Sequence, residues 1–349
     1  MENLPDSLIH WYINSYRKLP WRENKDPYRI WLSEVILQQT RVEQGLPYFN
    51  KFIERYPTLE NLANANEQEV LKLWQGLGYY SRARNMLITA QIVMEEHNGE
   101  FPTSYDSLLK LKGIGPYTAS AIASFAFDLP HPVKDGNVER VISRMFAIQA
   151  DVKTRAGQME IDSHLNSIFP TDRAAIFNQA IMELGSQVCT PKSPKCELCP
   201  WVNNCIAFEL KQQEQFPKKK KKKAAVHVHF NYLIIENNQK IYIEQRQDGI
   251  WKNLYQFPLI QGQIPVKELV PFIENKFGDQ KIEELELSYK CIHVLSHLKI
   301  NAHFYKIQFQ RPFKPQKSAI FEIDIEELNS QYPVPVLIDK FLKIRRDNG

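Results

Sequence analysis

The chain has 349 residues and a formal net charge of +4. This length exceeds that of one small domain and predicts two domains. Hydrophobic residues make up 43% of the sequence and charged residues 24%, the usual mixture of a globular protein. No apolar run approaches the roughly 18 residues that a transmembrane helix needs, so we expect no membrane span.

The N-terminal sequence "MENLPDSLIHWYINSYRKLPW" has neither a basic start nor a long apolar core. We therefore expect no secretory signal and a cytoplasmic location. The mild positive charge permits a polyanionic partner without requiring one.

The first predicted domain, residues 1–215, is all-α. Apolar runs of helical length alternate there with short breaks that contain proline or glycine. In one of these helices, the stretch "YRIWLSEVILQQTRV" surrounds Glu34 with apolar residues on nearly every side. A charged and unpaired carboxylate in such a setting would cost several kcal/mol. Either the helix exposes Glu34 to water or the chain keeps this acid for its chemistry.

A glycine-rich turn follows in "LKGIGPYTASAIASFAF", where Gly113 and Gly115 flank Ile114. Two glycines allow a tight turn, and Pro116 suits the first position of the next helix. The free N–H groups of that helix can bind an anion. A plain helix–helix turn is the simple interpretation, and a helix-hairpin-helix that grips DNA phosphates without reading sequence is the functional one.

A second carboxylate stands in "HPVKDGNVERVISRMF", where Asp135 precedes a helix predicted to begin near Val138. Helix capping is the simple role for such a residue. A buried glutamate and an aspartate near a helix N-terminus would have their pKa values pushed apart. A neutral acid together with an anion is what cleavage of a glycosidic bond through an oxocarbenium-like state requires.

The cysteines are unevenly distributed, because Cys291 stands alone and the other four have the spacing Cys189-x6-Cys196-x2-Cys199-x5-Cys205. This pattern is not a secreted disulfide framework and indicates a metal site in a reducing compartment. The compact loop favours a cubane iron–sulfur cluster. A zinc site and free thiols are the alternatives.

The chain then changes character at residues 216–225, where six consecutive lysines, Lys218 to Lys223, predict a solvated linker with weak attraction to phosphates. Residues 226–349 are predicted to form a smaller α+β domain. The runs "VHVHFNYLII" and "KIYIEQR" form a hairpin around "ENNQ", and "KCIHVLSHLKINAHFYKIQF" contains a second pair of strands. The stretch "VPVLIDKFLKIRR" predicts a closing helix.

Taken together, the motifs resemble a known family. "WLSEVILQQTRV", "LWQGLGYYSRARN", "LKGIGPYTA", "DGNVERV" and the cysteine loop are similar to those of adenine DNA glycosylases of the MutY type, which belong to the helix-hairpin-helix glycosylase superfamily. The resemblance covers most of residues 6 to 210. The second domain more loosely resembles the Nudix-like domain of this family.

The resemblance implies removal of adenine mispaired with 8-oxoguanine or guanine in duplex DNA, by a bacterial-type monomer that is nucleoid-associated when bound to DNA. Glu34 matches the general acid that protonates adenine, and Asp135 matches the carboxylate that stabilises the sugar cation. Tyr117 and Asn137 match residues that support Asp135 and the cation. Cys189, Cys196, Cys199 and Cys205 match the ligands of one 4Fe–4S cluster.

Further positions match DNA-contacting residues of the family. The implied contacts are to the duplex and the oxidised guanine (Gln39, Thr40, Leu77, Gly78 and Tyr79), to phosphates (Gly113 and Gly115), to the adenine pocket (Trp21, Arg22 and Gln179) and to 8-oxoguanine (Ser296 and His297). Two departures stand out. Leu295 replaces the aromatic residue of a Phe-Ser-His element, and Glu139 stands where relatives are basic or apolar.

Three other functions are less well supported by the sequence. A glycosylase with lyase activity, of the endonuclease III type, would carry a lysine where this chain has Tyr117. A hydrolase of free nucleoside diphosphates would need a glutamate-rich R-E-x-x-E-E-x-G helix, and "IPVKELVPFIENKFGDQ" lacks it. A DNA-binding protein without activity would be expected to have lost Glu34 or Asp135.

Overall fold

The structure is a computed structural model that describes residues 3–219, 225–237, 240–278, 280–295, 297–315 and 319–347. Most of the predicted lysine linker lies outside these residues. The chain divides into two compact units, Met1–Asn64 with Asn85–Lys221 and Ala65–Arg84 with Lys222–Gly349. The sequence boundaries at 215 and 226 stay a prediction, because the contacts also assign the segment Ala65–Arg84 to the second unit.

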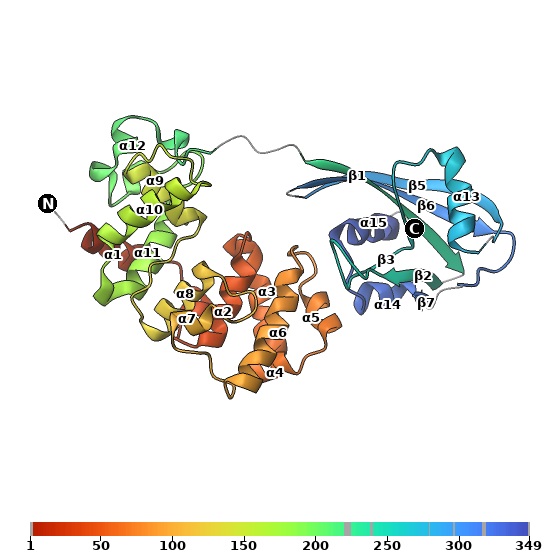
Figure 1. Ribbon diagram of the computed structural model, residues 1–349, viewed down its shortest axis with the longest axis horizontal. Helices are drawn as coiled ribbons and strands as arrows, with labels where there is room; N and C mark the ends of the chain where they lie inside the picture. The colour runs from red at the N-terminus through yellow and green to blue at the C-terminus, as the bar shows by residue number, and fades with distance from the viewer. Residues whose placement is uncertain are drawn as a thin grey trace. The chain divides into compact units, whose positions relative to one another are not determined.

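The first unit is built from helices and loops (Figure 1). Its helices are α1 (Leu4–Ser15), α2 (Pro27–Leu37), α3 (Val42–Arg55), α4 (Leu59–Ala63), most of α6 (Ser81–Glu96), α7 (Tyr105–Leu108), α8 (Pro116–Phe127), α9 (Gly136–Met145), α10 (Arg155–Ile168), α11 (Ala174–Gln187) and α12 (Ile206–Glu209). Residues 3–219 contain no strand, which confirms the predicted all-α character. Within the described parts of the chain, no helix is both long and apolar enough to cross a membrane.

Helices α2 and α8 pack side by side and form the centre of the first unit. The N-cap of α2 is Asp26, whose side chain accepts a hydrogen bond from the N–H of Tyr28, and every residue from Ile30 to Ile36 is buried. Helix α8 begins with Pro116 and buries a row of mostly small residues between Thr118 and Phe125. Small side chains allow the two helices to approach closely, which explains why α2 is buried on nearly all sides.

Helices α9 and α11 also approach closely, and Gly185 of α11 makes this possible. A Cβ atom built on Gly185 would lie 2.6 Å from the Cβ of Asn137 in α9, closer than such atoms come in proteins. The side chain and the backbone of Asn137 are therefore positioned by a glycine that is distant from it in the sequence.

The second unit contains a mixed sheet with the order β3-β2-β1-β6-β5, while β4 pairs with β1 and β7 pairs with β2. Its strands are β1 (Val226–Asn237), β2 (Lys240–Gln245), β3 (Tyr255–Gln256), β4 (Leu259–Gln261), β5 (Ile282–Val294), β6 (Leu298–Phe309) and β7 (Ile320–Asp324). Its helices are α5 (Glu67–Leu73), α13 (Val266–Lys276), α14 (Ile325–Ser330) and α15 (Val336–Asp347). Both predicted strand pairs and the closing helix are confirmed.

The sheet is covered on both faces, which explains the continuous apolar run of β1. Tyr232 and Ile234 face a core that includes Phe341 of α15. Leu233 and Ile235 face the opposite core, which includes residues of α13. Strand β1 pairs in parallel with β6 over most of its length, and parallel strands are typically buried in this way. The second unit is therefore a mixed sheet between two helical layers, the α+β Nudix-like domain that the sequence predicted.

The contact between α9 and α11 leads to a prediction about stability. Gly185→Ala should lower the free energy of unfolding by about 1–3 kcal/mol, because its methyl group would overlap Asn137. Gly136→Ala is the matched control, since a Cβ there meets no atom within 4 Å. Thermal unfolding followed by circular dichroism should give a lower Tm for the first variant alone, and equal Tm values for the two variants would contradict this packing.

Candidate active site

A cavity of about 900 Å³ opens in the first unit between α1, α2, the start of α8, the start of α9 and α11. Such a volume is in the range of sites that bind small molecules or single building blocks of polymers. The four residues predicted to be catalytic all line it, namely Glu34, Tyr117, Asp135 and Asn137. Trp21, Arg22, Thr40 and Gln179 line it as well.

Glu34 lies in the buried middle of α2 with only 5% of its surface exposed. Burial raises the pKa of Glu34 from 4.5 to about 7, against the lowering effect of a hydrogen bond from Tyr117, while the nearby charge of Asp135 raises it further. A carboxyl group with this pKa is present in both protonation states near neutral pH. It can therefore donate a proton and later take one back.

Tyr117 is the second residue of α8 and donates its hydroxyl proton to Oε2 of Glu34 over 2.5 Å. Burial, together with the charges of Glu34 and Asp135, raises the pKa of Tyr117 well above its ordinary value, so the phenol remains a donor. The close packing of α8 on α2 produces this contact. Tyr117 thus bonds to the predicted acid, whereas the resemblance had implied support for Asp135.

Asp135 is the N-cap of α9, as predicted. Its Oδ1 accepts hydrogen bonds from the backbone N–H groups of Asn137 at 2.9 Å and Val138 at 2.8 Å. Its Oδ2 accepts one from Nδ2 of Asn137 at 2.7 Å. Asn137 is held in turn by Arg140, whose Nη2 donates to Oδ1 of Asn137 at 2.9 Å. Asp135 therefore has a fixed orientation at the positive end of a helix.

The pKa of Asp135 is raised by burial, although its three hydrogen bonds and the charge of Arg140 favour the ionised form. The sequence had predicted that the pKa values of the two carboxyl groups would be shifted in opposite directions. In the structure, burial raises both pKa values. They differ in their partners. Asp135 accepts three hydrogen bonds, two of them from helix N–H groups, while Glu34 accepts one from Tyr117.

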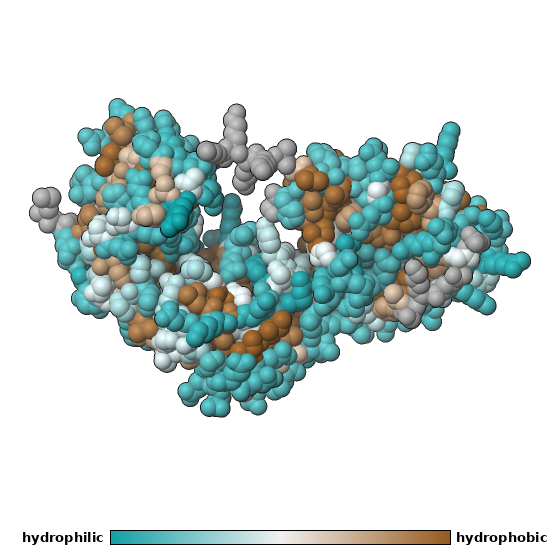
Figure 2. Space-filling view, in the orientation of Figure 1, coloured by the Kyte–Doolittle hydropathy of each residue, from teal (hydrophilic) through white to brown (hydrophobic). Residues whose placement is uncertain are grey.

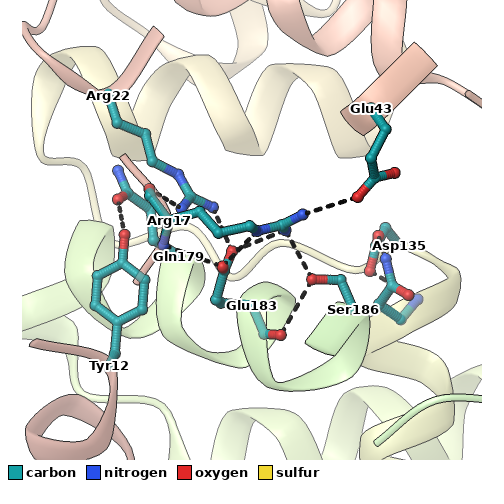
Figure 3. A network of polar contacts seen from close by, with 9 residues as sticks. Tyr12, Arg17, Arg22, Glu43, Asp135, Gln179, Glu183 and Ser186 are labelled. Carbon is teal, nitrogen blue, oxygen red and sulfur yellow. Dashed lines mark hydrogen bonds and ion pairs between the residues drawn. The ribbon is translucent and has the colours of Figure 1, made fainter. Parts of the chain in front are cut away.

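A network of charged side chains, of which the sequence had identified only Arg22, forms another wall of the cavity (Figure 3). Glu183 of α11 is fully buried and accepts from Nε of Arg17 at 2.6 Å and from Nη2 of Arg22 at 2.9 Å. Burial would raise the pKa of Glu183, but these two guanidinium groups hold it below its ordinary value. Beside them, the hydroxyl of Tyr12 donates to Oε1 of Gln179 at 2.6 Å.

One signal for Glu183 was present in the sequence, because the acid interrupts the apolar run "AIMELG" much as Glu34 interrupts its own helix. Its partners could not be found in this way. Arg17 and Glu183 are 166 positions apart, and only the packing of α1 on α11 brings their segments together.

The turn after α5 holds the predicted duplex-contacting residues Leu77, Gly78 and Tyr79. Gly76 and Gly78 have positive φ, at 105° and 73°, and Tyr79 adopts φ 48°, a conformation uncommon for a tyrosine. Nε1 of Trp74 donates to the carbonyl oxygen of Gly78 at 3.0 Å. Tyr79 is 49% exposed, whereas Leu77 is buried. Gln39 is exposed as well and has φ 60°.

The glycine hairpin has the predicted form, but its two glycines serve different purposes. Gly113 has φ 79°, and a Cβ there would lie 2.7 Å from the Cβ of Asn85, so this position requires glycine. Gly115 has ordinary extended backbone and open space around it. Without a side chain, Gly115 leaves the backbone N–H groups at the start of α8 accessible to an anion.

The cysteine loop lies beside two buried arginines. Nη1 of Arg144 donates to Sγ of Cys189 at 3.3 Å, and Nε of Arg140 donates to the Cys189 carbonyl oxygen at 2.7 Å. A cluster held by four thiolates carries negative charge, which these guanidinium groups would offset, so the donor set and its surroundings fit an iron–sulfur cluster. Among the described residues, no three His, Cys, Asp or Glu side chains converge as for a single metal ion. Thiolates around a cluster lie farther apart because several irons separate them.

The predicted 8-oxoguanine-reading residues are in the second unit, where the β5–β6 hairpin turns. Ser296 lies outside the described residues. His297 is exposed, and its carbonyl oxygen accepts from the N–H of Val226 at 3.0 Å. Leu295 packs against the core of the unit. Val226 of β1 and Ile292 and Val294 of β5 are exposed apolar residues. Figure 2 shows apolar patches on the surface of the second unit.

Comparison with known proteins assigns the chain to a family. It is 35% identical over 342 residues to the adenine DNA glycosylase of Buchnera aphidicola subsp. Schizaphis graminum, and the match covers 97% of each chain. The chain belongs to the adenine DNA glycosylase family. The human adenine DNA glycosylase is 42% identical over 218 residues, covering 60% of this chain and 40% of the human one. The chain is therefore an enzyme of base-excision repair that hydrolyses N-glycosidic bonds in DNA.

Three family models agree with the architecture. Residues 32–170 match the HhH-GPD superfamily of base excision DNA repair proteins, residues 189–205 the iron-sulfur binding domain of endonuclease III, and residues 231–343 the NUDIX domain. The second match spans the cysteine loop, so the enzyme carries a 4Fe–4S cluster, and zinc and free thiols are no longer alternatives.

Solved structures agree with the fold of the helical part. A thermostable thymine-DNA glycosylase aligns with TM-score 0.53 and 25% identity, over 59% of this chain and 95% of that one. A trapped endonuclease III–DNA intermediate aligns with TM-score 0.51 and 24% identity, over 59% of this chain and 94% of that one, and supports the fold alone.

The raised pKa of Glu34 leads to a pH-dependent prediction about stability. Between pH 4.5 and about 7 the folded chain binds a proton that the unfolded chain releases, so this group loses its contribution to stability as the pH rises. Glu34→Gln removes that penalty, which reaches up to about 3 kcal/mol above pH 7. The Tm advantage of the variant should therefore be larger at pH 8 than at pH 5. An equal difference at both values would show that Glu34 titrates normally.

Proposed function

We propose that the enzyme excises adenine mispaired with 8-oxoguanine or guanine in duplex DNA, with Glu34 as the general acid and Asp135 as the anion that stabilises the sugar cation. The observation that carries this proposal is the meeting of Glu34, Tyr117 and Asp135 in one cavity, with the pKa of Glu34 raised to about 7. A base inside a duplex cannot reach a buried carboxyl group, so the adenine must be flipped out of the stack.

The chemistry then follows from the two environments. Glu34 transfers its proton to N7 of adenine while the bond between N9 and C1′ breaks and its electron pair leaves with the base. Positive charge develops on the deoxyribose, where Asp135, oriented by Asn137, opposes it. Water adds to C1′ and loses a proton, which regenerates the acid. Trp21, Arg22 and Gln179 line the cavity that holds the base.

DNA is held by other parts of the chain. The hairpin with Gly113 and Gly115 presents backbone N–H groups to phosphates. Gln39 and Thr40, together with Leu77, Gly78 and Tyr79, enter the duplex beside the flipped adenine and contact the opposite base. Ser296 and His297 hydrogen-bond to 8-oxoguanine. Cys189, Cys196, Cys199 and Cys205 would hold the cluster, and their thiolates would supply its ligands. The enzyme acts as a cytoplasmic monomer.

Lyase chemistry is disfavoured by the cavity itself. Lys25 is the one lysine among the described residues that line it, and Lys25 forms an ion pair with Asp128. Tyr117 occupies the position of the lyase nucleophile and has no amine. The enzyme is therefore a monofunctional glycosylase.

Hydrolysis of nucleoside diphosphates in the second unit is disfavoured as well, because two carboxylates in and beside α13 are already paired with lysines. Glu244 lies 3.5 Å from Nζ of Lys276, and Glu274 lies 2.8 Å from Nζ of Lys281. Two lysines at the end of and after α13 oppose the binding of the divalent cations that such chemistry uses. The second unit is thus a recognition module.

The assignment of roles predicts the behaviour of two amide variants. Glu34→Gln cannot donate a proton, and Asp135→Asn removes the anion while it preserves the helix cap. General acid catalysis and electrostatic stabilisation each commonly contribute about 10²- to 10⁴-fold. Both variants should therefore lose at least about a hundredfold in single-turnover excision of adenine opposite 8-oxoguanine, with DNA affinity retained.

Glu60→Gln, at an exposed position of α4, is the control for the loss of a carboxylate and should remain as active as the wild type. Normal excision by Asp135→Asn would reduce Asp135 to a helix cap. A defect in Glu34→Gln that is fully matched by a loss of folded protein would likewise contradict its role as an acid.

A further inference from the structure

Helix α5 and the turn that follows it pack within the second unit, against the segment that joins α14 to α15. Lys72 is central to this contact. Its Nζ donates to the carbonyl oxygens of Asn329 at 2.8 Å and Tyr332 at 2.9 Å. Asn329 is in the last turn of α14 and Tyr332 follows the helix, where carbonyl oxygens lack an intrahelical partner and an unmet acceptor would be costly. Burial lowers the pKa of Lys72, as expected for an amine enclosed by protein.

Gln75, at the start of the turn, bonds to the same segment from a second side. Its Oε1 accepts from the N–H of Val334 at 3.2 Å and its Nε2 donates to Oδ1 of Asp339 in α15 at 3.1 Å. Oε1 also accepts from Nζ of Lys72 at 3.3 Å, which links the two side chains. The buried hydroxyl of Tyr80 adds a bond to the Val334 carbonyl oxygen at 3.3 Å. We call Lys72 and Gln75 the joint.

A loop that connects β2 to β3 forms a second bridge, to α5 and to Arg84. Nδ2 of Asn253 donates to Oε1 of Glu67 at 2.5 Å, and Nη1 of Arg84 donates to the Lys252 carbonyl oxygen at 2.9 Å. Trp251 and Asn253 both have positive φ, at 63° and 65°, so this loop is held in an uncommon conformation.

The same loop also touches the strand that leads to the recognition hairpin. The ring of Trp251 lies 5.8 Å from the ring of His293 in β5, centroid to centroid. Strand β5 ends at Val294, directly before the hairpin that carries Ser296 and His297. Continuous packing therefore runs from the hairpin, through Trp251 and Asn253, to α5.

The turn Gly76–Tyr79 follows Gln75 directly in the sequence, and hydrogen bonds to its backbone carbonyl oxygens hold it. Gln75 is followed by the residues Gly76 to Tyr79, three of which have positive φ. The carbonyl oxygen of Gly78 accepts from Nε1 of Trp74, and Nη2 of Arg82 donates to the carbonyl oxygens of Leu77 at 3.3 Å and Gly78 at 3.2 Å. A displacement of Gln75 would therefore move the whole turn.

We propose that Lys72 and Gln75 are positioning residues that couple the base bound by the recognition hairpin to the insertion of the turn Leu77–Tyr79 into the duplex. This inference rests on the proposed function, in which His297 contacts 8-oxoguanine and the turn enters the DNA. Neither residue touches the substrate. Their effect is to hold the turn at a fixed place on the recognition module, so that binding of 8-oxoguanine sets the turn for base flipping.

The test is a double-mutant cycle in the full-length enzyme, with Gln75→Ala, His297→Ala and the combination. Single-turnover excision is measured on duplexes with adenine opposite 8-oxoguanine and opposite guanine. Each single variant should lose about tenfold in excision opposite 8-oxoguanine, the size expected for one or two hydrogen bonds. Excision opposite guanine should change by less than about twofold, and the double variant should be no slower than the slower single variant.

Lys72→Met, which keeps the aliphatic stem but removes the donors, should repeat the result of Gln75→Ala. Lys240→Met, at an exposed position of β2, is the matched control and should leave both rates unchanged. Tm values are recorded for each variant, because a purely structural contact would lower stability and slow both substrates equally.

Equal slowing of both substrates, or losses that multiply in the double variant, would overturn the coupling. If the wild type itself does not distinguish 8-oxoguanine from guanine, or if His297→Ala keeps a normal preference, the proposed function of the hairpin fails and the coupling falls with it. A preference that is lost in His297→Ala but kept in Gln75→Ala and Lys72→Met overturns the coupling alone.

Discussion

The desolvation of Glu34 is the constraint on which the active site depends. Burial of its carboxyl group in the packing of α2 and α8 raises the pKa of Glu34 to about 7, and the hydrogen bond from Tyr117 limits that rise. Burial without this bond would leave an acid too weak to give up its proton readily, and exposure would leave an anion with no proton to give. Glu34 lies in the buried stretch of α2, and α8, which packs against α2, buries a row of small residues.

Asp135 must stay ionised, and the hydrogen bonds that its carboxylate accepts favour that state. Its carboxylate also suffers from burial, but α9 supplies two N–H groups and Asn137 supplies a third donor. Gly185 permits the close approach of α11 that positions Asn137. The same helix carries Glu183, which accepts hydrogen bonds from Arg17 and Arg22 in another wall of the cavity. The two acids in the cavity thus differ in their hydrogen-bond partners, although burial raises the pKa of both.

Local patterns in the sequence predicted the elements and the acids, because helix periodicity, capping and an acid in an apolar run leave local traces. Glu34, the Asp135 cap, the hairpin and the strand pairs β1–β2 and β5–β6 were recoverable in this way. Contacts between distant segments were not: the bond from Tyr117 to Glu34, the Arg17–Glu183 pair and the joint at Lys72 arise from packing. The departure at Glu139 gains a physical explanation, since it lies in the first turn of α9 and accepts from Gln158 at 2.8 Å.

The central claim is that a partly protonated Glu34 supplies the proton, and the pH dependence of excision tests it most directly. Under subsaturating conditions, where the profile reports the free enzyme, the rate for the wild type should fall as the pH rises above about 7. In Tyr117→Phe the bond that favours ionised Glu34 is lost, so the fall should move to higher pH whatever the absolute rate. A wild-type rate that stays constant up to pH 9, or a fall that does not move in Tyr117→Phe, would contradict the account.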